Sequence, residues 1–187
     1  MLRPRTLVLY GTTDGHTRKI ATALAESVRS MDQEVDVINA RSHIDPNPAD
    51  YDAVIVASPV RAGRYQRDVR RWVKAHAATL DRRHAAFVSV CLSVLDKSES
   101  ARAALARMLE EFVKETGWRP TMVKVVPGAL LYTRYNWITR WIMKRIVARA
   151  HGDTDTRRDY EYTDWSDLRT FAREFASAVS PARRRVS

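Results

Sequence analysis

The sequence predicts an α/β fold, a doubly wound parallel sheet of five strands in the order 2-1-3-4-5. Short apolar runs alternate with amphipathic helical segments along most of the 187 residues. Strands separated by helices pair in parallel, because each crossover helix returns the chain to the same edge of the sheet. Residues 53–57 (AVIVA) are apolar throughout, as expected of a central strand covered on both faces. We therefore expect a ligand at the carboxyl ends of the strands, where the strand order reverses.

The five strands are expected at residues 5–10, 35–38, 53–57, 85–91 and 122–126. The first, third and fourth are apolar runs that match buried central strands. The second is short and partly alternating. The segment 41–52 between the second and third strands contains two prolines and several Asp and Asn residues, which predicts a loop.

Four helices are expected at residues 15–30, 66–80, 99–117 and 166–179, each with apolar residues at helical spacing. Gly117 is a candidate C-cap, and Asp164 or Ser166 is a candidate N-cap. The pattern is interrupted at residues 132–159, which predicts a helical insertion in or after the fifth strand. No linker or repeat is visible, so we expect a single domain over residues 1–180 and a basic tail over 181–187.

Composition favours a globular protein with an acidic partner. Hydrophobic residues make up 45% of the chain, the formal net charge is +10 and the sequence pI is about 10.2. An anionic membrane, a nucleic acid or an acidic small molecule would suit this charge. The excess of positive charge is concentrated in two places. Residues 128–152 contain five Arg or Lys and no Asp or Glu, and Arg183–Arg185 form a second cluster.

The single cysteine, Cys91, excludes an internal disulfide and a multi-cysteine metal site, and we expect no metal. The first apolar run is too short for a signal peptide, and no run reaches the length of a transmembrane helix. These observations predict a cytoplasmic protein.

The junction between the first strand and the first helix suits a phosphate. Such a junction directs backbone N–H groups and the helix dipole at one place in front of the sheet. Hydroxyls that can donate hydrogen bonds and glycines that allow close approach follow the strand: Gly11, Thr12, Thr13, Gly15 and Thr17. Neither G-x-G-x-x-G nor a P-loop is present. The alternative is an ordinary turn capped by Thr13 or Asp14.

This junction resembles the flavodoxin signature, in which apolar and aromatic residues precede hydroxyl and small residues. The positions that match are Val8, Leu9, Tyr10, Thr12, Gly15, Thr17 and Ala21. A flavin also needs its ring held between loops. Two later loops, residues 58–65 and 89–95, end the third and fourth strands at the same sheet edge.

The second loop offers Tyr65 to pack on the ring, unless Tyr65 belongs to the core. It also carries Arg61 and Arg64, whose presence on one loop favours anion recognition over two solvated charges. We assign no chemical role to Cys91, because most lone cysteines are buried apolar residues. The predicted cofactor-binding residues are Thr12, Thr13, Asp14, Gly15, His16, Thr17, Ser58, Pro59, Val60, Arg61, Gly63, Tyr65, Ser89, Val90, Cys91 and Leu92.

The insertion mixes large apolar and cationic side chains on one helical face, and its other face is mostly apolar. Indole rings beside Arg and Lys are typical of a membrane interface. The predicted membrane contacts are Trp137, Arg140, Trp141, Lys144 and Arg145. The alternatives are a core-packed helix with a cationic exterior, and nucleic-acid binding, which no known motif accompanies.

Over residues 6–176 the chain resembles the flavodoxin-like menaquinone-dependent protoporphyrinogen IX dehydrogenases of bacterial haem synthesis. Five blocks carry this resemblance beyond the first loop: Val60-Arg61 with Gly63 and Tyr65; Gly117-Trp118-Arg119-Pro120; Gly128-Ala129-Leu130 followed by Tyr132, Arg134-Tyr135 and Trp137; Gly152-Asp153-Thr154-Asp155-Thr156-Arg157; and Tyr162-Thr163-Asp164-Trp165. The third loop, residues 91–96, departs from the pattern, and the arginine-rich tail lies outside it.

The resemblance implies non-covalent FMN, oxidation of protoporphyrinogen IX to protoporphyrin IX, and electron delivery to menaquinone or another quinone at the inner face of the membrane. FMN N5 is expected to carry the chemistry, and no side chain is assigned as a catalytic acid or base. Arg61, Arg64 and Arg134 are candidates to hold the substrate carboxylates. Two alternatives stay open: a flavodoxin electron carrier or FMN quinone reductase, and a non-enzymatic basic module that binds nucleic acid. The sequence does not set the oligomeric state.

Overall fold

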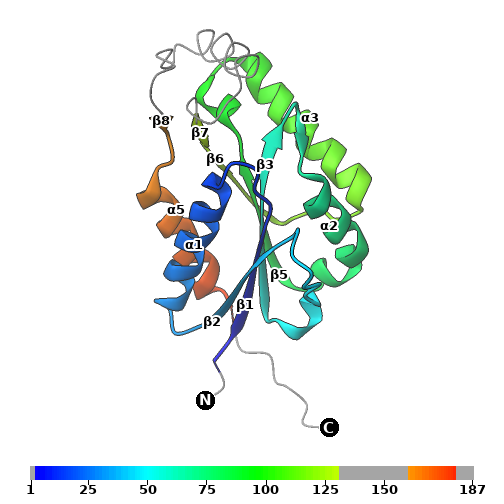
Figure 1. The fold of residues 1–187 in the computed structure, drawn as a ribbon, viewed down its shortest axis with the longest axis vertical. Helices are drawn as coiled ribbons and strands as arrows, with labels where there is room; N and C mark the ends of the chain where they lie inside the picture. The colour runs from blue at the N-terminus through cyan, green and yellow to red at the C-terminus, as the bar shows by residue number, and fades with distance from the viewer. Residues whose placement is uncertain (1–2, 131–159, 180–187) are drawn as a thin grey trace.

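A parallel sheet forms the centre of the computed structural model, which describes residues 3–130 and 160–179 (Figure 1). Its order is β2 (Glu34–Asn39), β1 (Arg5–Tyr10), β3 (Ala53–Arg61), β5 (His84–Val90) and β6 (Met122–Val126). All of these neighbouring pairs are parallel. The predicted fold class and the 2-1-3-4-5 order of the five parallel strands are confirmed.

Helices cover both faces of the sheet. α1 (His16–Arg29) and α5 (Trp165–Ser177) pack side by side on one face, and α2 (Arg67–Leu80) and α3 (Glu99–Thr116) on the other (Figure 1). Gly117 ends α3 at φ 77°, and the Asp164 side chain accepts hydrogen bonds from two backbone N–H groups at the start of α5. Both capping predictions are confirmed, with Asp164 rather than Ser166 at the N-cap.

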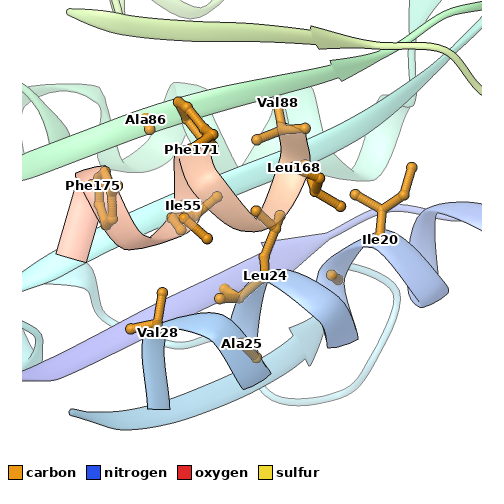
Figure 2. Packing of buried hydrophobic residues seen from close by; sticks show 14 of the residues in the cluster. Ile20, Leu24, Ala25, Val28, Ile55, Ala86, Val88, Leu168, Phe171 and Phe175 are labelled. Carbon is orange, nitrogen blue, oxygen red and sulfur yellow. The ribbon is translucent and has the colours of Figure 1, made fainter. Parts of the chain in front are cut away.

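Two apolar cores follow from the alternation of side chains along the central strands. On the first face, Leu24 of α1 and Phe171 of α5 pack over Ile55 and Val88 (Figure 2). On the second face, the Phe87 ring lies 4.5 Å from Phe112 between centroids. The sheet is therefore fixed from both sides, and its carboxyl edge is a rigid base for the loops that follow it.

Residues 58–65 form a β-hairpin rather than the predicted loop. β3 continues to Arg61 and pairs antiparallel with a short strand, β4 (Arg64–Tyr65). The two residues between them, Ala62 and Gly63, have φ of 48° and 74°. Two successive left-handed residues make a two-residue hairpin turn whose twist matches its strands.

A second small sheet closes the base of the predicted insertion. β7 (Ala129–Leu130) pairs antiparallel with β8 (Tyr160–Glu161). The insertion itself and the tail lie outside the described residues, and so do six predicted site residues: Arg134, Trp137, Arg140, Trp141, Lys144 and Arg145. Within the described ranges, no helix is long and apolar enough to cross a membrane.

Candidate functional site

The loops after β1, β3 and β5 enclose one cavity of about 310 Å³ at the carboxyl edge of the sheet. This volume lies within the range of ligand sites, about 300–1,000 Å³. The cavity is lined by Thr12, Thr13, Asp14, His16, Thr17, Pro59, Val60, Arg61, Ala62, Gly63, Val90, Cys91, Leu92, Ser93, Gly128 and Ala129. Twelve of the predicted cofactor-binding residues are in this set.

The first loop presents the start of α1, with glycine at the N-cap, to the cavity. The N-cap of α1 is Gly15 at φ 89°, a residue without a side chain that could accept a capping hydrogen bond, so neither Thr13 nor Asp14 occupies the N-cap position. The first N–H groups of a helix have no acceptor within the helix. The Thr12 hydroxyl accepts a hydrogen bond from the Gly15 N–H at 2.9 Å, so its own proton remains available to a ligand. This loop suits an anion.

Gly11 allows the first and second loops to meet. A Cβ on Gly11 would lie 2.1 Å from Gln66 Oε1 and 2.7 Å from Val69 Cγ2. The Gln66 side-chain amide also donates to the Thr12 carbonyl at 3.4 Å, and its backbone N–H donates to the Ser58 hydroxyl at 3.2 Å. Gln66 therefore joins the two loops through contacts that only glycine at position 11 permits.

The second loop supplies one cation to the cavity instead of two. Arg61 is exposed and lines the cavity beside the hairpin turn. Arg64 lines a separate groove between the hairpin and α3, where its charge helps to lower the pKa of Glu115. The largest contribution to that lowering is the hydrogen bond from Arg70. The expectation that both arginines of this loop face one ligand site is corrected, because only Arg61 lines the cavity.

Three predicted cofactor contacts instead support the cavity from behind. Tyr65 is 5% exposed, and its ring lies in the second core against Phe87 and Phe112. Its hydroxyl donates to the Ser89 hydroxyl at 3.0 Å. Ser58 is also fully buried. The expectation that Tyr65 packs on a ligand is corrected, because the interior of the protein covers its ring.

The third loop and the segment after β6 complete the wall. Cys91 is 6% exposed, and its Sγ lies 2.7 Å from the Ser93 hydroxyl. Gly128 and Ala129 also line the cavity, although they are not among the residues predicted to bind the cofactor. Their signal was present, since both belong to a block that carries the family resemblance. Among the described residues, no three His, Cys, Asp or Glu side chains gather where a metal ion could bind.

His16 links the cavity to the segment that follows β8. Its ring is 8% exposed, and its Nε2 lies 2.8 Å from the Thr163 hydroxyl. Burial lowers the pKa of His16 below the ordinary 6.5, although the nearby Glu161 carboxylate acts in the opposite direction. Burial acts to raise the pKa of Glu161. The hydrogen bond from Lys19 and the charge of His16 outweigh burial, so the pKa of Glu161 lies below 4.5.

These shifts predict a loss of stability on mild acidification. The unfolded chain takes up a proton at His16 near pH 6.5 and the folded protein does so only at lower pH, so the free energy of unfolding falls as the pH drops below 6.5. The slope for one group is at most about 1.4 kcal/mol per pH unit. The urea midpoint of unfolding, measured at about pH 7.5 and again at about pH 5.5, should fall between these two pH values by a larger amount in the unsubstituted protein than in His16→Gln. Equal losses would contradict this assignment. Glu161 adds to the loss only below 4.5.

Comparison with known proteins agrees with this geometry. A family model described as flavodoxin domain matches residues 7–157. A protein named protoporphyrinogen IX dehydrogenase [quinone] from Escherichia coli (strain K12) is 37% identical over 172 residues, which cover 92% of this chain and 94% of the relative. A protein of the same name from Leishmania major is 35% identical, covering 95% of this chain and 78% of its own.

Solved structures support the fold. Oxidised flavodoxin 1 from Bacillus cereus superposes with a TM-score of 0.57 at 16% identity, over 94% of this chain and 99% of that one. The flavodoxin of Streptococcus pneumoniae TIGR4 gives 0.56 at 15% identity, with the same coverage. At this identity the likeness concerns the fold alone. The family model and the two similar sequences go further, and they show that the chain belongs to the flavodoxin-like protoporphyrinogen IX dehydrogenase [quinone] family of oxidoreductases.

Proposed function

We propose that the protein oxidises protoporphyrinogen IX to protoporphyrin IX in haem biosynthesis, with FMN as cofactor and a quinone, menaquinone in our proposal, as electron acceptor. The observation that carries this proposal is the 37% identity, over 92% of the chain, with a relative named for that substrate and acceptor. The fold alone would also suit a flavodoxin electron carrier, but the identity extends over nearly the full length of a named dehydrogenase.

The cavity fits FMN in the chemistry of its donors. The start of α1 and the hydroxyls of Thr12, Thr13 and Thr17 would hold the phosphate. The hairpin turn at 59–63 and the loop at 90–93 line the rest of the cavity and would hold the ring. When bound, FMN supplies the chemistry, acceptance of hydride equivalents from the porphyrinogen and their transfer to the quinone. The protein orients the reactants and limits access of water.

Arg61 is the candidate for substrate recognition among the described residues. It is a cation at the cavity wall beside the turn that would hold the ring. Guanidinium groups bind carboxylates in a bidentate manner, and the substrate carries two propionates. Arg134 remains a second candidate within the insertion.

We also propose that the insertion brings the site to an anionic membrane at the cytoplasmic face. Trp137, Trp141 and the neighbouring Arg140, Lys144 and Arg145 have the composition of an interfacial segment. Quinone and porphyrinogen are both apolar enough to partition into lipid. Co-sedimentation with anionic liposomes tests this: Trp137→Ala/Trp141→Ala should weaken binding, and unchanged binding would remove these residues from the membrane contact.

Two measurements separate the proposed function from its alternatives. The absorption spectrum of the purified protein should show oxidised flavin, whereas a nucleic-acid-binding module would be colourless and would bind DNA or RNA in a salt-dependent way. Porphyrin fluorescence should then rise when reduced porphyrinogen is added, and rise faster with a menaquinone analogue. A coloured protein that leaves porphyrinogen unoxidised would instead be an electron carrier or a quinone reductase.

A further inference from the structure

The β7–β8 ribbon, residues 127–130 with 160–163, meets the cavity directly. Ala129 pairs with Glu161, and the Tyr162 N–H donates to the Gly128 carbonyl at 3.2 Å. Gly128 and Ala129 are also cavity-lining residues. The two chain segments on either side of residues 131–159 are therefore joined to each other at the cavity wall.

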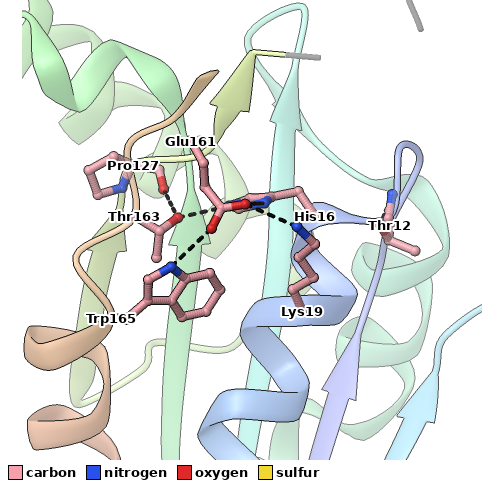
Figure 3. A network of polar contacts seen from close by, with 8 residues as sticks. Thr12, His16, Lys19, Pro127, Glu161, Thr163 and Trp165 are labelled. Carbon is pink, nitrogen blue, oxygen red and sulfur yellow. Dashed lines mark hydrogen bonds and ion pairs between the residues drawn. The ribbon is translucent and has the colours of Figure 1, made fainter. Parts of the chain in front are cut away.

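One histidine connects this ribbon to the first loop, and its hydrogen bonds fix its tautomer. The Thr163 hydroxyl lies 2.7 Å from the Pro127 carbonyl, which can only accept, so the hydroxyl donates there (Figure 3). A hydroxyl has a single proton. His16 Nε2, 2.8 Å from the same hydroxyl, must therefore be the donor to Thr163. The hydrogen bonds from His16 to Thr163 and from Thr163 to Pro127 therefore run in one direction, from α1 to both segments of the ribbon.

A carboxylate on the ribbon strengthens the same connection. Glu161 accepts a hydrogen bond from Lys19 of α1 at 3.1 Å and another from the Trp165 indole at 2.9 Å (Figure 3). Its other near neighbour is His16 Nδ1 at 3.6 Å. The His16 ring also packs edge-on against Trp165, with centroids 6.1 Å apart. His16 therefore bonds to the ribbon through Nε2 and packs against the first residue of α5 through its ring edge. With the proton on Nε2, Nδ1 has none to donate to Glu161, and the bonds of that carboxylate go to Lys19 and Trp165.

We propose that His16 is a positioning residue through which cofactor binding in the first loop and closure of the β7–β8 ribbon stabilise each other. His16 is the first residue of α1 and lines the cavity beside the phosphate-binding hydroxyls. A ligand that orders this loop also fixes the His16 ring, which lowers the cost of its bonds to Thr163 and the ribbon. Such coupling is reciprocal: a closed ribbon must raise cofactor affinity by the same factor. This proposal rests on FMN as the cofactor.

Hydrogen–deuterium exchange of the peptides that contain residues 160–165 tests the coupling, with FMN affinity measured in parallel by flavin fluorescence. Adding FMN to the unsubstituted apoprotein should slow exchange in these peptides by about tenfold, within the usual 5- to 150-fold range of such couplings. Thr163→Val and His16→Ala should abolish this FMN-dependent slowing and weaken FMN binding by a similar factor. His16→Gln and Thr163→Ser should retain both effects, because each keeps the side-chain donor or the hydroxyl.

Asp167→Asn is the matched control. It removes an ion pair between α5 and Lys124 of β6 in the same region, and Asp167 does not line the cavity. It should leave the FMN-dependent slowing unchanged. If His16→Ala and Thr163→Val keep the slowing of the unsubstituted protein, the coupling is overturned. If the unsubstituted protein binds no FMN, the proposed function and the coupling both fail, and FMN binding without slower exchange removes the coupling alone.

Discussion

Gly11→Ala is expected to destabilise the fold and weaken FMN binding together. The new methyl would overlap Gln66 Oε1 and press on Val69 Cγ2, at 2.1 and 2.7 Å. The Gln66 amide can move, but Val69 is a β-branched residue with no exposed surface and has little freedom in its helix. Overpacking of this kind costs about 1–3 kcal/mol. Thermal or urea unfolding of the apoprotein measures that cost.

The effect on FMN follows from the position of the clash. Gly11 directly precedes the loop proposed to bind the FMN phosphate, and moving Gln66 removes its bond to the Thr12 carbonyl. We expect the displaced loop to lose one charge-assisted contact with the FMN phosphate. Such a contact is worth about 1.5–3 kcal/mol, so FMN binding should weaken about ten- to a hundredfold. Calorimetric titration of the apoprotein with FMN measures this change.

Gly128→Ala is a suitable control for stability, because its Cβ would meet only Val90 Cγ1 at 3.4 Å and Leu92 at 3.8 Å. It should unfold near the unsubstituted midpoint. Gly11→Ala/Gln66→Ala should recover part of the stability, since the double change removes the amide clash and leaves the contact with Val69. If Gly11→Ala matches the unsubstituted protein in both measurements, the tight packing between the first and second loops is not required.

The fold could be predicted because its signals are local and repeated. A central parallel strand must be apolar on both faces, and residues 53–57 show this without any tertiary information. The caps at Gly117 and Asp164 likewise depend on the backbone preferences of single residues. Once helices and strands alternate, the order of the sheet and the edge that binds a ligand follow from chain-crossing rules.

Parts of the site could not be predicted because they depend on which way a short segment faces. β4 has only two residues, Arg64 exposed and Tyr65 buried, and two residues are too few to show a period in the sequence. From the sequence alone Tyr65 could therefore face a ligand or the core, and only the structure shows that its ring packs against Phe87. Gly128 and Ala129 reach the cavity through the pairing of β7 with β8, across an interval of about thirty residues that no local pattern spans.

The largest functional effect is expected from Arg61→Ala, which should lower kcat/KM for protoporphyrinogen IX about ten- to a hundredfold. This factor corresponds to the loss of a charge-assisted hydrogen bond to a substrate carboxylate, about 1.5–3 kcal/mol. FMN affinity should stay within a factor of about two, because Arg61 is exposed at the cavity wall and lies on the hairpin rather than in the loop proposed to bind the phosphate. The rate of increase of porphyrin fluorescence gives kcat/KM, and titration of the apoprotein with FMN gives the affinity for the cofactor.

Arg64→Ala is the matched control, since Arg61 and Arg64 pair directly across the hairpin and carry the same charge. Only Arg61 lines the cavity, whereas Arg64 lies in the groove with Glu115. If a specific contact with Arg61 holds the substrate, kcat/KM should fall in Arg61→Ala and not in Arg64→Ala. If the substrate is attracted only by the positive charge of the hairpin, kcat/KM should fall equally in both variants. Equal losses, or normal kinetics in Arg61→Ala, would move carboxylate recognition away from the cavity wall and leave Arg134 as the remaining candidate.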